Sequence, residues 1–368
     1  MTNGLLPEGL RDRLPPQAEA ASAILRAILD CVSAHGYDRV SPPLAEFEEE
    51  LVGRLKSARS RDLLRFVDPV SQRTLALRPD ITAQIGRIAT TRLASAARPL
   101  RLSYGGPVLK LRATQLRPER ELIQAGAELI GSDSVAAVIE IIGVAVEALN
   151  AAGVTGITLD LTLPDLVDAL AKGPWPVAAD RIDALKAALD AKDAGALTDA
   201  DTKLYLPLIV ATGALDTALP VLRALGIADV MRDRFAAIEA IAAAFPDVRI
   251  TLDPTERHGF EYQSSIGFSL FGAGLLGEAG RGGSYTIVHA GGREEPAVGF
   301  SLFLDPLVDA GLMQRDAKRI FIPLGSDQSI AAKLRREGWA TISQISAACD
   351  ARALGCAYVI EGQDVVAL

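Results

Sequence analysis

Apolar residues recur every three or four positions between Pro16 and Gly36, which is the spacing of one face of an α-helix. The flanking residues agree, because proline is favoured at the start of a helix and glycine just beyond its end. We therefore predict an amphipathic helix here, followed by a short strand at 37–41 that Pro42 stops. The apolar positions of the helix are Ala21, Ile24, Leu25, Ile28, Leu29 and Val32.

Alternation of apolar and polar residues predicts a series of strands after this helix. Two runs flank the loop at 69–73 and predict an antiparallel hairpin, and a helix is expected from Asp80 onward. The segment 105–107, Gly-Gly-Pro, is expected to interrupt the strand pattern around it. Together these features predict an antiparallel sheet flanked by helices. Its strands are expected at 64–68, 74–78, 100–104, 108–112, 122–130, 156–161, 248–252, 262–271 and 296–303, with a glycine-rich connection at 272–283.

Two parts of the chain differ from this pattern. Residues 166–245 are rich in Ala, Leu and Asp at helical spacing and carry no convincing strand pattern, which predicts a helical insertion. Residues 316–368 combine short strand patterns with one helical stretch, which predicts a small α/β region. We therefore expect an α+β protein whose main domain covers 1–315, contains the insertion, and precedes a small C-terminal region at 316–368.

The most apolar long window, residues 134–153, contains Glu140 and Glu147 and ends at Gly153. These features are typical of a mostly buried helix and not of a membrane span, and Asp133 is expected to cap that helix. The N-terminus lacks a basic segment followed by an apolar one, so no secretory signal is predicted. The chain is accordingly expected to be cytoplasmic.

Charge and composition exclude several classes of protein. The 368-residue chain carries 38 Lys and Arg against 46 Asp and Glu, a net charge of −8, and 49% of its residues are hydrophobic. The hydrophobic content supports a large core. The negative net charge excludes a protein whose whole surface binds a polyanion, although it leaves room for a local basic patch. The three cysteines are too few and too scattered for a disulfide framework, and the three histidines lie far apart in sequence. Neither a metal site nor a cofactor is predicted.

The strand at 122–130 carries the first candidate site. Because side chains alternate between the two faces of a strand, Gln124, Gly126 and Glu128 share one face. A polar face with a central glycine lets a small ligand approach the backbone. The same pattern fits an ordinary half-exposed strand with a glycine bulge, and spacing alone leaves both interpretations open.

A second candidate lies where the hairpin leads into a helix. Asp80 and Thr82 stand two residues apart, and the carboxylate could bind an ammonium group, although either side chain could instead cap the helix. Lys110, with Arg117 and Arg120 in the charged loop that follows, could hold a phosphate or carboxylate, but a solvated loop fits equally well.

These pieces occur in the order found in one known family. Over about residues 4–310 the chain resembles histidyl-tRNA synthetase, a class II aminoacyl-tRNA synthetase, and this resemblance implies that family's antiparallel sheet flanked by helices. The matching segments are the N-terminal signature at 7–15 (PEGLRDRLP), motif 1 at 36–43 (GYDRVSPP), the substrate loop at 77–82 (LRPDIT), motif 2 at 101–110 (RLSYGGPVLK) through 124–128 (QAGAE), and motif 3 at 296–304 (PAVGFSLFL).

Departures from the family fall on its ATP side. The motif 2 arginine that holds ATP and the substrate carboxylate is replaced by Lys110, and the acidic residue that contacts adenine by Arg112. The motif 3 arginine falls on Pro306, which has neither the charge nor the hydrogen-bond donors. The arginine of the histidine-specific motif falls on His258, in the segment 258–263 (HGFEYQ). The resemblance therefore implies a chain without catalytic residues for amino-acid activation.

The amino-acid side of the pocket is retained. By resemblance, Asp80, Thr82 and Gln124 meet the ammonium group of histidine and Glu128 accepts a hydrogen bond from the imidazole. Further candidates are Lys110 and His258 for the ligand carboxylate, and Tyr262 and Gln263 near the imidazole. The C-terminal region is shorter than the usual anticodon-binding domain, which with the net charge argues against tRNA as a partner.

A synthetase-like chain with these features resembles the regulatory subunits of ATP phosphoribosyltransferase. The resemblance implies a non-catalytic subunit that activates a short-form catalytic subunit in the first step of histidine biosynthesis and conveys feedback inhibition by histidine. Motif 1 implies a homodimer core within a hetero-oligomer. The alternatives are a divergent histidyl-tRNA synthetase or another amino-acid-activating ligase, and a scaffold that has also lost histidine.

Overall fold

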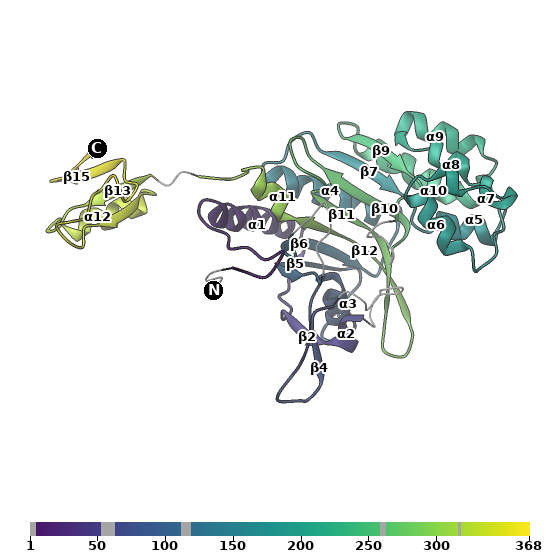
Figure 1. The fold of residues 1–368 in the computed structure, drawn as a ribbon, viewed down its shortest axis with the longest axis horizontal. Coiled ribbons are helices and arrows are strands. Elements are labelled where there is room, and N and C mark those ends of the chain that lie inside the picture. Colours follow the sequence, from purple (N-terminus) through teal and green to yellow (C-terminus); the bar gives the residue numbers. More distant parts are fainter. Residues whose placement is uncertain (1–4, 53–62, 112–118, 258–262, 316–317) are drawn as a thin grey trace. The chain divides into compact units, whose positions relative to one another are not determined.

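The structure is a computed structural model that describes residues 5–52, 63–111, 119–257, 263–315 and 318–368. The chain divides into two compact units, residues 1–313 and residues 314–368. The larger unit is built on a nine-stranded sheet that helices flank (Figure 1). Among the described residues, no helix is both long enough and apolar enough to span a membrane.

The predicted antiparallel sheet is confirmed in the larger unit. Its strand order is β1-β5-β6-β12-β11-β10-β7-β9-β8. All neighbours from β5 to β7 are antiparallel, whereas β1 runs parallel to β5 and β9 runs parallel to β7. The strands are β1 (Asp38–Arg39), β5 (Leu100–Leu109), β6 (Glu121–Ile130), β12 (Glu294–Phe303), β11 (Gly280–Val288), β10 (Gln263–Phe271), β7 (Thr158–Thr162), β9 (Arg249–Asp253) and β8 (Gly213–Ala214).

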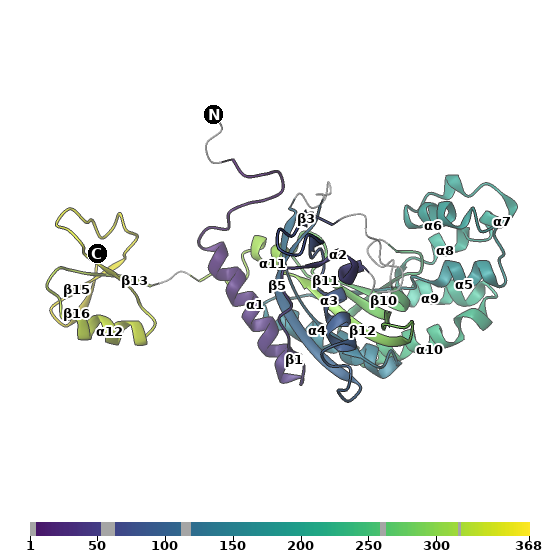
Figure 2. The same ribbon diagram turned by 90° about the horizontal axis from the view of Figure 1, so that it is seen from below.

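One face of this sheet packs against α1 (Gln17–Ala34) and α4 (Val135–Ala151), which lie beside it in both views (Figures 1 and 2). Ile24 and Ile28 of α1 meet Leu129 of β6 in a core that excludes water from this face. Asp133 does not cap α4 as predicted. The side chain of Ser134 accepts the Ala137 backbone N–H instead, because Ser134 is the residue directly before the helix.

The predicted break at 105–107 is wrong, because β5 runs unbroken through it. The Pro107 carbonyl accepts a hydrogen bond from Arg78 Nε at 2.8 Å, on the side of β5 away from β6. The Pro107 nitrogen faces the same side, so the missing N–H costs the ladder to β6 no hydrogen bond. Gly106 fits here because a Cβ would lie 2.6 Å from Arg78 Nη2.

The predicted hairpin is confirmed in a separate three-stranded sheet of order β2-β4-β3. It comprises β2 (Ala45–Phe47), β3 (Arg65–Val67) and β4 (Thr74–Leu77). Two helices belong to the same part of the chain, α2 (Glu48–Val52) and α3 (Thr82–Thr90). The turn from β4 into α3 carries Asp80 and positions it against the large sheet.

Helices dominate residues 166–244, and one short strand there was not expected. Gly213 and Ala214 form β8, which pairs with β9 at the edge of the large sheet. The helices are α5 (Leu166–Lys172), α6 (Ile182–Asp190), the 3₁₀ turn η1 (Ala194–Ala196), α7 (Ala200–Lys203), α8 (Leu206–Val210), α9 (Leu215–Ala224) and α10 (Ala228–Ala244). After β12, helix α11 (Leu304–Asp309) ends the larger unit's regular structure.

The smaller unit has its own four-stranded sheet of order β14-β13-β15-β16. Ile320 and Ile360 of this sheet pack with Leu334 of the helix in a separate core. The final strand, β16, was not predicted from the sequence. It follows β15 after a two-residue turn and pairs with it in the antiparallel direction. The elements are β13 (Arg319–Ile322), α12 (Gln328–Arg336), β14 (Ala340–Ser343), β15 (Tyr358–Glu361) and β16 (Asp364–Ala367).

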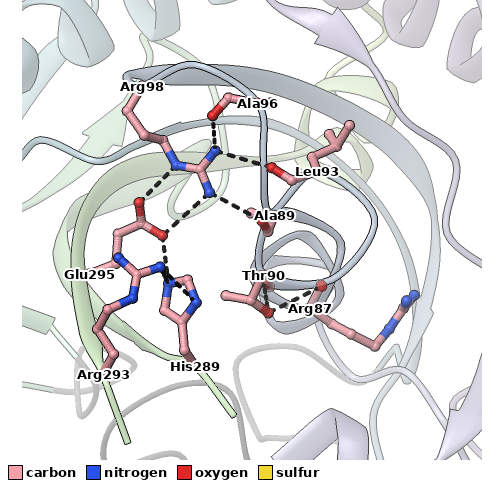
Figure 3. Close-up of polar contacts among 10 residues, drawn as sticks. Arg87, Ala89, Thr90, Leu93, Ala96, Arg98, His289, Arg293 and Glu295 are labelled. Carbon is pink, nitrogen blue, oxygen red and sulfur yellow. Dashed lines mark hydrogen bonds and ion pairs between the residues drawn. The ribbon is translucent and has the colours of Figure 1, made fainter. Parts of the chain in front are cut away.

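A partly buried ion network joins the segment after α3 to the β11–β12 hairpin (Figure 3). Arg98 Nε donates to Glu295 Oε1 at 2.7 Å, and its other nitrogens donate to the carbonyls of Ala89, Leu93 and Ala96. His289 Nε2 lies 2.8 Å from Glu295 Oε2. Burial opposes ionisation of Glu295, but the hydrogen bonds from Arg98 and His289 prevail and lower its pKa.

Arg98→Lys is expected to lower the free energy of unfolding by about 1–2 kcal/mol, because one ammonium group cannot replace the planar set of donors that reaches three carbonyls and a carboxylate. Denaturant unfolding measures the change. Arg92→Lys, at an exposed position nearby, is the matched control and should be neutral. Equal stability of the two variants would contradict the assigned role of Arg98.

Candidate ligand-binding cavity

A cavity of about 210 Å³ lies on the face of the large sheet opposite α1 and α4. This is below the roughly 300–1,000 Å³ of pockets for drug-sized ligands, so it suits a small molecule. Six of the eight predicted site residues line it, whereas His258 and Tyr262 lie outside the described residues, as does Arg112. The six are Asp80, Thr82, Lys110, Gln124, Glu128 and Gln263.

Gln124 of β6 connects the turn before α3 to strand β12 at one wall of the cavity. Its Nε2 donates to Asp80 Oδ2 at 2.9 Å and to Ser301 Oγ at 2.6 Å, and its Oε1 accepts the Ile81 backbone N–H at 3.0 Å. The side chain is only 1% exposed, so these bonds fix the amide orientation. The interpretation of β6 as a half-exposed strand with a bulge is wrong on both counts. Gln124 is buried, and the register between β5 and β6 is regular.

Asp80 lies both at the start of α3 and on the cavity wall. Its Oδ1 accepts the Thr82 backbone N–H at 2.6 Å, in the first turn of α3, and its Oδ2 meets Gln124 at the cavity wall. The carboxylate thus helps to satisfy the start of the helix while facing the cavity. Thr82 is buried beside it, and the Thr82 hydroxyl lies 3.4 Å from the hydroxyl of Tyr104.

Glu128 is held between two tyrosines. Tyr104 donates to Glu128 Oε1 at 3.0 Å, and Tyr285 donates to Glu128 Oε2 at 2.8 Å. Burial, with a further contribution from the nearby Asp80 charge, raises the pKa of Glu128 to about 8, although the tyrosine hydrogen bonds oppose this. The carboxyl of Glu128 is therefore harder to ionise in the ligand-free cavity than an ordinary glutamate. A ligand that brings a positive charge or an N–H donor favours its ionised form.

Glycines create the space around these polar groups. A Cβ on Gly299 would lie 1.6 Å from Glu128 Oε2, so only glycine allows the carboxylate its position. A Cβ on Gly126 would lie 2.2 Å from the Phe300 carbonyl oxygen, and one on Gly282 would lie 2.3 Å from that of Gly299. The cavity thus depends on close approach between the backbones of neighbouring strands.

Among the described residues, the cations that line the cavity are Lys110 and Arg281. Arg281 Nε donates to Glu278 Oε2 at 3.0 Å, and its guanidinium carbon lies 5.8 Å from the ring centroid of Phe303. Arg281 and Tyr285 were not among the predicted site residues, because 272–283 was predicted to be a connection, whereas β11 begins at Gly280. The segment 280–284, Gly-Arg-Gly-Gly-Ser, carries no apolar alternation that could reveal the strand.

Gln263, at the start of β10, completes the wall next to Tyr285. It is 8% exposed, and its Oε1 has no hydrogen-bond partner among the described residues. Gly283 and Gly267 flank this oxygen, since a Cβ on either would come within 3 Å of it. A polar amide with an unpaired oxygen among the described residues therefore lies at this end of the cavity wall.

At the edge of the cavity next to Phe303, Asp305 is hydrogen-bonded to other residues of the chain. Asp305, 4% exposed, accepts the Ile123 backbone N–H at 3.0 Å and the Arg13 guanidinium at 2.7 Å. Pro306 follows in the first turn of α11, where a proline needs no backbone N–H. Pro306 has no charged group that could bind a nucleotide phosphate.

Comparison with known proteins agrees with this geometry. The family model described as histidyl-tRNA synthetase matches residues 9–307. A protein of Paramagnetospirillum magneticum is 42% identical over 98% of this chain and 97% of its own, and one of Rhodospirillum rubrum is 40% identical over 98% and 96%. Both are named ATP phosphoribosyltransferase regulatory subunit.

Solved structures support the fold. A Bacillus halodurans structure described as an ATP phosphoribosyltransferase regulatory subunit/histidyl-tRNA synthetase has a TM-score of 0.80, with 24% identity over 96% of each chain. Histidyl-tRNA synthetase from Nostoc has a TM-score of 0.76, with 15% identity over 98% of this chain and 91% of that one. The class II synthetase-like fold is thereby confirmed.

Proposed function

Because the chain belongs to the family of ATP phosphoribosyltransferase regulatory subunits, which has the histidyl-tRNA synthetase fold, we propose that its cavity binds histidine and transmits that binding to a catalytic subunit. As a member, the chain has a regulatory and not a catalytic role in histidine biosynthesis. Its partner is a catalytic subunit of ATP phosphoribosyltransferase, and we assign the short form of that subunit to it.

The observation that carries the proposal is the charge arrangement of one small cavity. Asp80 and Glu128 supply acceptors on one side, and Lys110 and Arg281 supply cations on the wall. A free amino acid needs both, because its ammonium and carboxylate groups are oppositely charged. Glu128, inside the tyrosine pair, suits a side chain that carries an N–H, and the imidazole of histidine provides one.

An amino-acid-activating enzyme is disfavoured by the other half of the site. Such chemistry needs positive groups that stabilise charge on the phosphates as it develops. Pro306 offers none, and Asp305 beside it uses its carboxylate on Arg13 and Ile123. Histidine-dependent pyrophosphate–ATP exchange is expected to be absent, which distinguishes a regulator from a divergent synthetase.

Regulation follows if histidine binds two states of the assembly with different affinity. The direct test is phosphoribosyl-ATP formation by the short catalytic subunit from the same source, with and without this chain, while histidine is titrated. Activation by the chain, reversed by histidine, supports both roles. No effect on the catalytic subunit would overturn the proposal, whereas activation without inhibition would leave a scaffold that has lost histidine.

Asp80→Asn is expected to weaken histidine binding about tenfold, since it removes a charge from the ammonium site while keeping an acceptor for the Thr82 N–H. Titration calorimetry measures the affinity. Asp68→Asn, in the exposed β3–β4 turn, is the matched control and should bind histidine like the parent chain. Unchanged affinity in Asp80→Asn would remove Asp80 from the site.

We also propose a homodimer core built on the motif 1 segment. The two-residue strand β1 forms one edge of the large sheet, and both of its residues are exposed. An open sheet edge is a common place for a second chain to pack. Sedimentation of the isolated chain tests this, and a monomer at micromolar concentration would contradict it.

A further inference from the structure

Three side chains that bind transition metals converge where the end of α1 meets α4. Cys31 lies in the last turns of α1, His35 directly follows that helix, and Glu147 projects from α4. One ligand atom from each, the Cys31 thiol sulfur, a His35 ring nitrogen and a Glu147 carboxylate oxygen, lies within 4.8 Å of the others. No motif spacing connects the three residues, because Glu147 is remote in sequence from Cys31 and His35.

Local structure explains why these residues meet. Cys31 and His35 are four residues apart, so a helical turn places them on the same side. The helices α1 and α4 pack against each other through the core around Ile28 and Ile141, which brings Glu147 alongside. His35 Nε2 already lies 2.9 Å from Glu147 Oε2, so the imidazole and the carboxylate are oriented toward one another.

We propose that Cys31, His35 and Glu147 form a surface binding site for a single zinc-class divalent cation. Thiolate, imidazole and carboxylate are the ligand types that Zn²⁺ takes in proteins, at about 2.0–2.3 Å, and three protein ligands leave a fourth position for water. Tetrahedral coordination at those lengths needs ligand atoms roughly 3.3–3.8 Å apart. Pairs separated by up to 4.8 Å would have to approach by about 1 Å, and the His35–Glu147 pair at 2.9 Å would have to open slightly.

The surroundings permit such an ion to enter and to be held. The side chain of His35 is 33% exposed and that of Glu147 is 62% exposed, whereas Cys31 is partly buried. A cation therefore reaches the site from solvent and binds the thiolate on its inner side. Hard cations such as Mg²⁺ prefer oxygen ligands alone, so the thiol and imidazole select against them.

The bound ion would join α1 to α4, two helices that support the sheet from behind the cavity. Binding to the folded chain but not to the unfolded chain stabilises the fold. The site is separate from the histidine cavity, which lies on the opposite face of the sheet. The inference therefore stands or falls independently of the proposed histidine binding.

The test uses the full chain, without a polyhistidine tag, reduced and freed of metal with a chelator. Zn²⁺ is titrated in competition with a chromophoric chelator, and one equivalent is expected to bind with a Kd in the micromolar range or below. Cys31→Ser and His35→Gln should each weaken binding at least about tenfold, because each removes a direct ligand. Cys349→Ser, a partly exposed thiol in the smaller unit, is the matched control and should bind like the parent.

Two further readouts decide the assignment. Co²⁺ in place of Zn²⁺ should give a thiolate-to-metal charge-transfer band that persists in Cys349→Ser and disappears in Cys31→Ser. Zn²⁺, but not Mg²⁺, should raise the melting temperature of the parent and not of His35→Gln. Binding weaker than the micromolar range, or equal binding by Cys31→Ser and the parent, would overturn the site.

Discussion

Gly299→Ala is expected to reduce histidine affinity on the order of a hundredfold, which is the effect of losing about 3 kcal/mol from a charge-assisted contact. The new methyl group would lie 1.6 Å from Glu128 Oε2 and 2.8 Å from the Ala127 carbonyl oxygen. The side chain yields more readily than the backbone, so the carboxylate leaves Tyr104 and Tyr285 and no longer faces the ligand. Titration calorimetry measures the loss, and denaturant unfolding measures the accompanying change in stability.

The control for Gly299→Ala adds the same methyl group elsewhere. Gly143 lies within α4, where a Cβ would meet only the Phe245 ring at 3.7 Å, an ordinary contact. Gly143→Ala should therefore bind histidine normally and gain up to about 1 kcal/mol of stability from helix propensity. If Gly299→Ala bound histidine as tightly as Gly143→Ala does, Glu128 would not be the ligand's acceptor.

Glu128→Gln is expected to become more stable relative to the parent chain as the pH rises from about 4.5 to about 8. The ordinary pKa of a glutamate is 4.5, and that of Glu128 in the folded chain is about 8. Between these values the unfolded chain releases this proton while the folded chain retains it. The carboxyl's contribution to the free energy of unfolding therefore falls by about 1.4 kcal/mol per pH unit, a few kcal/mol in all, and levels off above pH 8.

The glutamine variant lacks this titration but can still accept from one tyrosine and donate to the other. The comparison is the difference in free energy of unfolding between parent and Glu128→Gln, measured in denaturant at several pH values without histidine. Glu19→Gln, at an exposed position of α1 outside the cavity, serves as the control, and its difference from the parent chain should change little over the same pH range. A constant difference between parent and Glu128→Gln would show that Glu128 is ionised in the empty cavity.

Local patterns predicted much of the fold, because its elements are strongly amphipathic. The helix ending at Ala34 and the hairpin around 69–73 follow directly from spacing. The prediction of a strand break at 105–107 was wrong because glycine and proline, which often form turns, also fit this stretch of β5. The edge of β5 there faces the Arg78 side chain and not another strand. That arginine, Arg78, is remote in sequence, so no local pattern could indicate it.

The polar core of the cavity was predicted only in part, for a related reason. Gln124 and Glu128 share a strand face and could be identified from alternation. Their partners Tyr104, Tyr285 and Ser301 come from three other strands, and only the strand order β5-β6-β12-β11 brings them within hydrogen-bond distance. The hydrogen bonds of Glu128 to the two tyrosines, and hence its protonation state, depend on the folded sheet and not on any local sequence pattern.

The glycines between these strands constrain which mutants a genetic selection can recover. If the cavity senses histidine as we propose, resistance in cells selected on a toxic histidine analogue requires a subunit that still activates its partner but no longer binds the inhibitor. Every substitution of a glycine adds at least one carbon, so its outcome depends on what that carbon meets. At Gly126 and Gly282 it meets a backbone carbonyl at 2.2 and 2.3 Å, which threatens the sheet itself. At Gly299 it meets first the Glu128 carboxylate, so resistant alleles should accumulate at this codon and be rare at the other two.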